Sequence, residues 1–306
     1  MKFLLLLTIS SLLVITSCSN DQASETPPLQ IGLMPTMDSV AIATAYELGL
    51  FATHGVSVEL VPFSSARDRD AAFLAGAIDG ATVDLIAVGL MNEAGVSVRA
   101  TSTTTTHFSL IAQPEFTTLE SLNDRTIMIS YNTAIDFIMD EMLNFYNLDN
   151  NHIIREEVGN IPTRFEMVRA NLADAALISE PFATMAYADG LNLITDTFQV
   201  DFNPLVLAFS LETITTRYHD LQAFYAAYQE AVNFLNTQPV EEYLDMIIDL
   251  IGFPANVTSY ITLPTFLSPH VPNAELVSAA HAWLINKNLI NPDTPTCNFT
   301  YQITPK

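Results

Sequence analysis

The sequence predicts an α/β protein in which mostly parallel sheets carry helices on both faces. Short apolar or alternating segments, which are typical of strands, are followed by longer segments with helical spacing of their apolar residues. This order recurs along the chain as far as residue 204, and it is the pattern of βαβ units. With 306 residues, the chain is long enough for one large domain or two of ordinary size.

The first series of elements runs from residue 29 to residue 100. Residues 56–60 alternate between apolar and polar side chains, as a half-buried strand does. Asp38 and Ser65 are suitable caps for the first two helices, and Gly49 and Gly55 can end the first of them. The expected strands are 29–34, 56–60, 81–83 and 97–100, and the expected helices are 38–51, 66–77 and 85–92.

A second series follows, and the pattern then changes after Pro204. Pro162 stands in the first turn of its helix, where its missing N–H costs nothing. The expected strands are 126–130, 157–158, 175–178, 192–194 and 205–209, and the expected helices are 133–147, 162–171, 182–188, 211–235, 240–251 and 274–286. Tyr225, Tyr228 and Leu235 fall at helical spacing, which predicts a core stripe.

Composition and charge exclude two classes of protein. About 49% of the residues are apolar and 15% are charged, so the chain is globular and not disordered. The 34 acidic residues outnumber the 11 basic ones and give a formal charge of −23. Nucleic acid is therefore excluded as a partner, because binding it requires Lys and Arg against the phosphates. Two cysteines, Cys18 and Cys297, are too few for a disulfide framework, and we expect Cys297 to be a half-buried spectator thiol.

The N-terminus carries the features of a secretory signal. Lys2 precedes an apolar run over residues 3–15, which is too short to cross a membrane. The run ends in Ile15-Thr16-Ser17-Cys18, which resembles a bacterial lipobox. The resemblance implies a lipoprotein signal peptide over 1–17, a diacylated Cys18 and a polar tether over 18–28. The protein would then be extracytoplasmic and lipid-anchored to a membrane; an ordinary signal peptide that contains a cysteine is the alternative.

No catalytic or metal-binding motif is present in the sequence. The phosphate-binding loop, the dinucleotide fingerprint and the Gly-x-Ser-x-Gly elbow are all missing. No two of the six histidines stand at the spacing of metal ligands. A metal site could form only from histidines that are distant in the sequence. The run Arg67-Asp68-Arg69-Asp70 is expected to form a solvated helix face. We therefore expect a protein that is not an enzyme and holds no cofactor and no metal.

Several segments, in their order and spacing, resemble one protein family. The chain is similar to the SsuA/THI5-like (NMT1-type) periplasmic binding proteins, the substrate-binding lipoproteins of ABC transporters, over essentially all of residues 29–290. The segments that carry this resemblance are 31–35, 45–51, 55–62, 73–79, 160–167, 174–182 and 283–284.

This resemblance implies a type II periplasmic-binding-protein fold with two lobes that close on two hinges. The first lobe would hold 29–104 plus 205–306, and the second 105–204. The implied function is capture of a small solute between the lobes, by a monomer, for an ABC permease whose ATPase is a separate chain. Two alternatives stay open: a ligand-sensing partner of a membrane receptor, and an enzyme on the same fold. The THI5-type pyrimidine synthases carry a cysteine-rich motif that is missing here.

Ligands of open α/β sheets lie beyond the carboxyl ends of the strands, facing helix N-termini. Polar side chains in the strand-to-helix turns, with one threonine at the first crossing between lobes, are therefore the candidate ligand-binding residues. For several of them, helix capping is an equally good role. They are Thr36, Asp38, Ser64, Ser65, Asp84, Thr106, Tyr131, Asn132, Thr133, Asn160, Thr163 and Glu180.

The charges in these turns favour a cationic ligand. Asp38, Asp84 and Glu180 are carboxylates, no lysine is present, and Arg67 and Arg164 are expected inside helices beyond the turns. A buried carboxylate needs a cation or several donors. The favoured ligand is thus an amine or an aminopyrimidine, similar to a thiamine precursor. The alternative is a sulfonate, a nitrate or another oxyanion held by helix N-termini, with the carboxylates serving as caps.

We predict that Cys18→Ala releases the protein from the membrane, because the variant cannot receive the lipid. Immunoblots of membrane and soluble fractions measure the release, and Cys297→Ala serves as the control that keeps its anchor. Equal membrane association of the Cys18→Ala variant and the parent would contradict the lipidation hypothesis.

Overall fold

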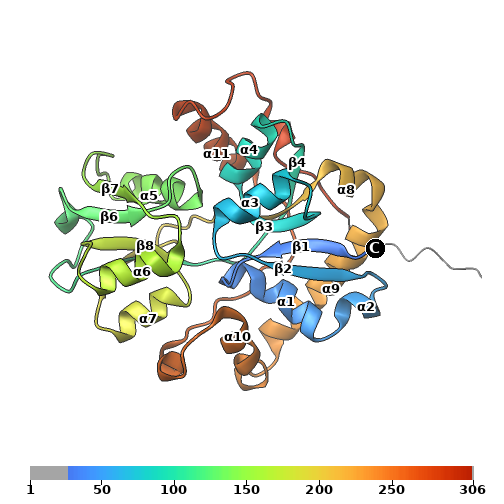
Figure 1. Cartoon of the computed structure of the whole chain (residues 1–306), viewed down its shortest axis with the longest axis horizontal. Coiled ribbons are helices and arrows are strands. Elements are labelled where there is room, and N and C mark those ends of the chain that lie inside the picture. Colours follow the sequence, from blue (N-terminus) through green and yellow to red (C-terminus); the bar gives the residue numbers. More distant parts are fainter. Residues whose placement is uncertain (1–26, 305–306) are drawn as a thin grey trace, which may run out of the picture.

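The structure is a computed structural model that describes residues 27–304. Two five-stranded sheets lie side by side along the long axis, each with helices on both faces (Figure 1). The first has the order β2 (Val58–Pro62), β1 (Leu29–Leu33), β3 (Gly80–Asp84), β10 (Leu205–Ser210) and β4 (Val98–Thr103). The second has the order β7 (Ile154–Glu157), β6 (Thr126–Ile129), β8 (Ala175–Ser179), β5 (Phe108–Ala112) and β9 (Asn192–Asp196).

Four strands of each sheet point one way, and one strand runs against them. In the first sheet β10 is antiparallel to β3 and β4, and in the second β5 is antiparallel to β8 and β9. The predicted fold class, with mostly parallel sheets, is confirmed. The sequence analysis missed β5, whose five residues are all buried, because so short an apolar run has no periodicity of its own.

The helices agree with the predicted ones except where the backbone breaks them. They are α1 (Val40–Glu47), α2 (Leu50–Thr53), α3 (Ala66–Leu74), α4 (Leu85–Glu93), α5 (Ala134–Phe145), α6 (Ile161–Arg169), α7 (Phe182–Ala188), α8 (Leu211–Thr216), α9 (Tyr218–Thr237), α10 (Leu244–Ile251) and α11 (Ala274–Asn286). The expected helix 38–51 is divided because Gly49 has φ +66°, outside the helical region. The expected helix 211–235 is divided at Arg217, whose φ is −124°.

Four hydrophobic clusters hold the two sheets and their helices together. One face of the first sheet packs against α1, α9 and α10, and the other against α4 and α11. In the second sheet, α5 covers one face while α6 and α7 cover the other. The predicted stripe of Tyr225, Tyr228 and Leu235 is buried in the first cluster, which confirms its role in the core.

The chain passes between the two sheets twice. Residues 104–107 connect β4 to β5, and residues 197–204 connect β9 to β10. The strand expected to end at residue 100 continues to Thr103 because it pairs with β10. After β10, helices α8 to α11 return to the first sheet (Figure 1).

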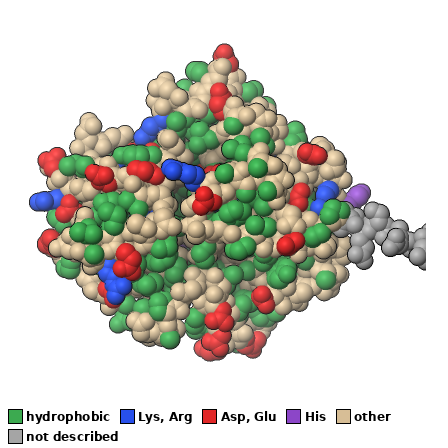
Figure 2. Space-filling model, in the orientation of Figure 1, with side chains coloured by type: hydrophobic (Ala, Val, Ile, Leu, Met, Phe, Trp, Pro, Cys, Tyr) green, Lys and Arg blue, Asp and Glu red, His purple; other side chains and the backbone are tan. Residues whose placement is uncertain are grey.

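The face of the molecule seen in Figure 2 has no single dominant acidic patch. Acidic side chains are spread over the face seen in Figure 2, with few basic ones among them. Cys297 is exposed, so the expectation that it is half-buried is wrong. Cys18 and the expected signal peptide lie outside the described residues, and most of the tether does too. Within residues 27–304, no helix is both long and apolar enough to cross a membrane.

Candidate functional site

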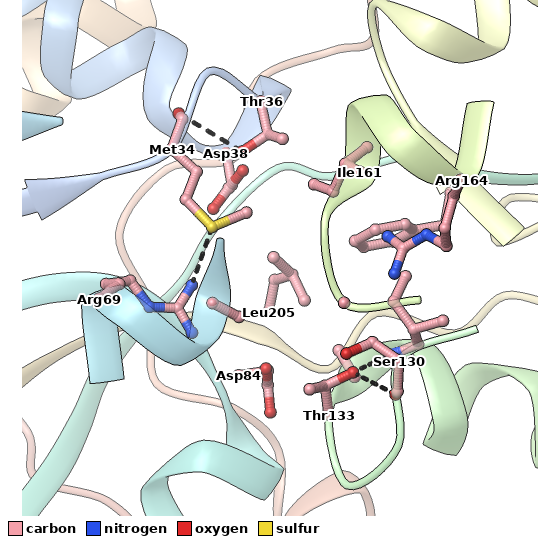
Figure 3. Close-up of a pocket in the computed structure, with 15 residues that line it drawn as sticks. Met34, Thr36, Asp38, Arg69, Asp84, Ser130, Thr133, Ile161, Arg164 and Leu205 are labelled. Carbon is pink, nitrogen blue, oxygen red and sulfur yellow. Dashed lines mark hydrogen bonds between the residues drawn. The ribbon is translucent and has the colours of Figure 1, made fainter. Parts of the chain in front are cut away.

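A small cavity of about 50 Å³ lies between the two sheets, where residues of both meet (Figure 3). The segment after β1, helix α3 and the end of β3 supply one wall, with Thr36, Asp38, Arg69 and Asp84. The turns before α5 and α6 and the first turns of these helices supply the other wall, which includes Arg164 of α6. A wider groove of about 810 Å³ shares lining residues with this cavity and continues from it along α3.

Polar residues cap the helices whose N-termini surround the cavity. Ser65 accepts from the backbone N–H of Asp68 at 3.2 Å, and Asp84 from that of Ala87 at 2.8 Å. Thr133 accepts from the N–H of Ile135 at 3.2 Å. Asn160 caps α6 in the same way. Each cap satisfies one N–H group of its helix, and the positive dipole ends of these helices lie around the cavity and the adjoining groove.

Asp38 differs from these residues because it caps nothing. Its side chain is 3% exposed, and its Oδ1 atom is buried with no hydrogen-bond partner among the described residues. Burial raises the pKa of the Asp38 carboxyl, while the Thr36 hydroxyl and the Arg69 guanidinium oppose that rise. The Asp38 carboxyl is therefore an acceptor that points toward the cavity with unused capacity (Figure 3).

Arg69 lies beside the two aspartates on the same wall. It is 3% exposed, and its Nη2 atom is 2.7 Å from Oδ1 of Asp70. Burial raises the pKa of Asp84 to about 6, with Arg69 opposing that rise and Asp70 adding to it. The expectation of a fully solvated face over 67–70 is wrong for Arg69, which is at helical spacing with the buried Phe73.

Arg164 stands on the opposite wall and is almost fully buried, at 1% exposed. Its Nη1 atom donates to the backbone oxygen of Val158 at 3.0 Å, while Nε has no partner among the described residues. Within residues 27–304, no carboxylate lies within ion-pair distance of the guanidinium. Burial lowers the pKa of Arg164 to about 10, against the attraction of Glu157. The wall therefore holds a buried cation without an ion-pair partner in the described part of the chain.

Comparison with protein families identifies the chain. Residues 22–248, more than half of its length, match the NMT1-like family. The chain belongs to the NMT1-like family. This confirms the resemblance drawn from the sequence. A comparison with curated protein sequences found no match.

Solved structures show that the NMT1-like chain has the type II periplasmic-binding-protein fold. The alkanesulfonate-binding protein SsuA from Xanthomonas axonopodis pv. citri matches with TM-score 0.78 and 15% identity, covering 91% of this chain and 99% of that one. The aliphatic sulphonate binding protein SsuA from Escherichia coli matches with TM-score 0.75 and 16% identity, over 92% and 94%. The nitrate-binding protein NrtA from Synechocystis PCC 6803 matches with TM-score 0.71 and 13% identity, over 89% and 84%.

The structure brings only some of the predicted residues of this NMT1-like chain to the cavity. Thr36, Asp38, Asp84 and Thr133 line it. The wider groove is lined by Ser65, Tyr131, Asn132, Thr133 and Asn160. Ser64, Thr106, Thr163 and Glu180 line neither space.

The four residues outside both spaces are separated from them by exposure or by other contacts. Ser64 and Thr163 are exposed, and the Thr163 hydroxyl donates to Asn160 at 2.8 Å. Thr106 is buried away from the cavity. Glu180 accepts from the N–H of Thr184 at 3.0 Å and has His107 at 4.0 Å.

Arg69 and Arg164 are the two charged lining residues that were not among the predicted site residues. Arg164 was expected inside a helix beyond the turns, and it does lie in α6, but it also lines the cavity. A signal was present in α6, because Ile161, Arg164 and Val168 follow the i, i+3, i+7 spacing of a buried helix face. An arginine on an apolar helix face is buried together with its charge. Burying a charge is costly unless an opposite charge or hydrogen bonds compensate it.

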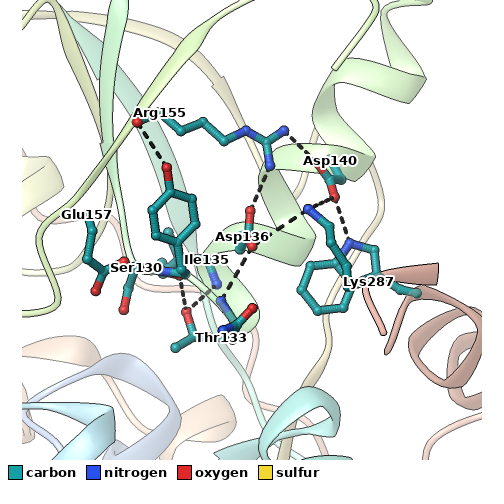
Figure 4. Close-up of polar contacts among 11 residues, drawn as sticks. Ser130, Thr133, Ile135, Asp136, Asp140, Arg155, Glu157 and Lys287 are labelled. Atoms are coloured by element: carbon teal, nitrogen blue, oxygen red, sulfur yellow. Dashed lines mark hydrogen bonds and ion pairs between the residues drawn. The ribbon is translucent and has the colours of Figure 1, made fainter. Parts of the chain in front are cut away.

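A polar cluster joins α5, beside the cavity, to α11 on the first sheet (Figure 4). The indole N–H of Trp283 donates to Asp140 at 2.7 Å, and Nζ of Lys287 is 3.1 Å from the same carboxylate. Arg155 pairs with both Asp136 and Asp140. Tyr131, one of the candidate ligand-binding residues, donates its hydroxyl to the backbone oxygen of Arg155 at 3.0 Å.

We predict that Trp283→Phe lowers the free energy of unfolding by about 1–3 kcal/mol, because a buried oxygen of Asp140 loses its N–H donor. Urea unfolding followed by fluorescence and circular dichroism measures the change. Tyr260→Phe is the control: this residue is 48% exposed and its hydroxyl makes no hydrogen bond within residues 27–304, so the change should stay within about 0.5 kcal/mol. Equal stability of the Trp283→Phe variant and the parent would contradict this role.

Proposed function

We propose that the protein is the extracytoplasmic solute-binding component of an ABC importer. Its solute carries an oxyanionic group such as a sulfonate, and it binds in the cavity between the two sheets. Membership of the NMT1-like family and the likeness to sulfonate- and nitrate-binding proteins support this proposal. The observation that carries it is the buried guanidinium of Arg164, which faces the cavity without a carboxylate partner among the described residues (Figure 3).

The chemistry of the cavity supports an oxyanion at Arg164. A guanidinium presents a planar set of N–H donors that match two oxygens of a carboxylate or sulfonate. The first turns of α5 and α6 also line the cavity, with Ala134, Ile135 and Ile161. Backbone N–H groups at helix N-termini bind anions as well. An amine or aminopyrimidine without an anionic group would leave the buried charge of Arg164 unmatched, so it is the weaker choice.

Binding is favoured over catalysis as the role of this cavity. The relatives named above are described as binding proteins, and neither His nor Cys lines the cavity within residues 27–304. The enzyme and the ligand-sensing partner of a receptor remain alternatives of another class. The proposed partners are an ABC permease with a separate ATPase chain, and the membrane through a lipid on Cys18.

The proposed lobes are 29–104 plus 205–306, and 105–204. Both boundaries fall in the connections between the two sheets, which supports this division. Two connections at one side of a cleft allow hinge closure over a bound solute.

We predict that Arg164→Met abolishes oxyanion binding while raising the free energy of unfolding by about 1–4 kcal/mol, because the variant no longer buries an unpaired cation. Calorimetric titration with ethanesulfonate and nitrate measures binding, and urea unfolding measures stability.

Arg169→Met is the matched control, since Arg169 lies on the same helix but is exposed and paired with Glu166 and Asp189. It should bind like the parent. Undiminished oxyanion binding by Arg164→Met would contradict the proposed role of Arg164.

We also predict that a saturating solute closes the lobes. Small-angle X-ray scattering should give a smaller radius of gyration with solute than without it, because closure brings two large units together. The Arg164→Met variant, mixed with the same solute, is the control, and its radius of gyration should not change. Identical scattering curves of the parent with and without bound solute would contradict closure.

A further inference from the structure

Helix α11 brings two scarce residue types to one contact with the second sheet. Trp283 is the only tryptophan of the sequence, and Lys287, four positions later at the end of the same helix, is the only lysine within residues 27–304. The indole N–H of Trp283 and the ammonium of Lys287 both reach Asp140 of α5, at 2.7 and 3.1 Å. The ammonium also lies 5.0 Å from the centre of the Trp283 ring. Helix α11 therefore meets α5 through a donor and a positive charge on the same carboxylate.

The charges at this contact balance only when both sheets contribute. Asp136 and Asp140 of α5 are 2% and 4% exposed, and both pair with Arg155 of β7. Two carboxylates and one guanidinium leave the second sheet with one negative charge in excess at this point. The ammonium of Lys287 comes from the first sheet and lies 3.1 Å from Asp140 and 3.8 Å from Asp136 (Figure 4). A buried charge is costly unless it is paired, so the contact removes a cost that neither sheet removes alone.

An aromatic side chain of α5 enters the core of the first sheet beside these charges. Phe137 is 1% exposed and packs in the hydrophobic cluster that holds residues of β3, α4 and α11. Its ring centroid lies 5.4 Å from that of Trp283 and 4.9 Å from that of Phe202, which belongs to the connection 197–204. Separating α5 from α11 would therefore expose two large aromatic rings and break the ion pairs of Lys287 at the same time.

We propose that the contact between α5 and α11 is a latch that forms when the two lobes close and breaks when they open. Its polar members are Asp136, Asp140, Trp283 and Lys287, and none of them lines the cavity or the wider groove. The latch thus goes beyond solute binding. It stabilises the closed form by its ion pairs and by the burial of Phe137. Without solute the protein exchanges between open and closed forms, and a solute adds its own contribution to the closed one.

Asp136 connects the latch to the wall of the cavity. Its Oδ2 atom accepts from the backbone N–H of Asn132 at 3.4 Å, and the Lys287 ammonium lies 3.8 Å from the same oxygen. Asn132 belongs to the turn before α5, and the next residue, Thr133, lines the cavity. Formation of the latch therefore fixes the carboxylate that holds this turn, so closure of the lobes also positions one wall of the cavity.

Charge reversal at Lys287 tests the latch without any solute. The Lys287→Glu variant places three carboxylates against the one guanidinium of Arg155, and like charges brought together at an interface repel each other. Small-angle X-ray scattering of the full chain should give a larger radius of gyration for this variant than for the parent. Because Trp283 is the only tryptophan, acrylamide quenching of its fluorescence reports on the contact itself, and we expect stronger quenching in the variant.

Two further variants are the controls. Lys287→Arg keeps the positive charge and should keep the radius of gyration and the quenching of the parent. Arg169→Glu changes the net charge by the same amount as Lys287→Glu, but Arg169 pairs with Glu166 and Asp189 inside the second lobe, so this variant should also match the parent. In calorimetric titration with ethanesulfonate, Lys287→Glu should bind at least about tenfold more weakly than the parent, a difference of about 1.4 kcal/mol.

The outcomes separate the latch from the proposed function. Unchanged scattering and unchanged quenching in Lys287→Glu overturn the latch, whether or not the parent binds ethanesulfonate. A lower free energy of unfolding with an unchanged radius of gyration also overturns it, because the contact would then be a fixed part of the fold. A larger radius of gyration with stronger quenching supports the latch even if the parent binds no ethanesulfonate, in which case only the proposed function fails.

Discussion

Burying charge in the space between the two sheets is the constraint on which the rest of the structure depends. Arg164, Arg69, Asp38 and Asp84 are each less than 5% exposed. Moving an isolated charge out of water costs several kcal/mol of free energy. Ion pairs such as Arg69 with Asp70 offset only part of this cost. Four hydrophobic clusters on the outer and inner faces of both sheets provide the stability that offsets the remaining cost. A bound solute of complementary charge would remove much of that cost.

The sequence predicted most strands because they are bounded by turn residues and followed by capped helices. Asp84 and Ser65, for example, accept the hydrogen bonds expected of N-caps. The sequence did not predict β5, because a fully buried strand of five residues does not alternate between polar and apolar side chains. The antiparallel pairing of β5 with β8 depends on residues that are distant in the sequence. The sequence also did not predict the break at Arg217, where a non-glycine residue interrupts the expected long helix.

The candidate site was harder to predict than the fold, because the same residue types serve as caps and as ligands. Ser65 and Asn160 use their side chains for capping, while Asp38 caps nothing and keeps an unpaired oxygen. Local sequence does not distinguish these cases, since the difference lies in what each side chain meets across the cavity. Arg164 was placed in its helix correctly, but the inward direction of its side chain follows from the apolar spacing around it.

Helix α5 connects the cavity to the contact with α11. Its first turn, at Ala134 and Ile135, lines the cavity, and about one and a half turns further along the same helix Asp140 accepts from Trp283. Phe137 lies between these points and packs against both Trp283 and Phe202, with ring centroids 5.4 and 4.9 Å apart. An α-helix of this length moves as a rigid rod. Any displacement of α5 relative to the first sheet therefore changes the cavity wall and the Trp283–Asp140 hydrogen bond together. The Trp283–Asp140 hydrogen bond therefore joins the cavity wall formed by α5 to a helix that packs on the first sheet.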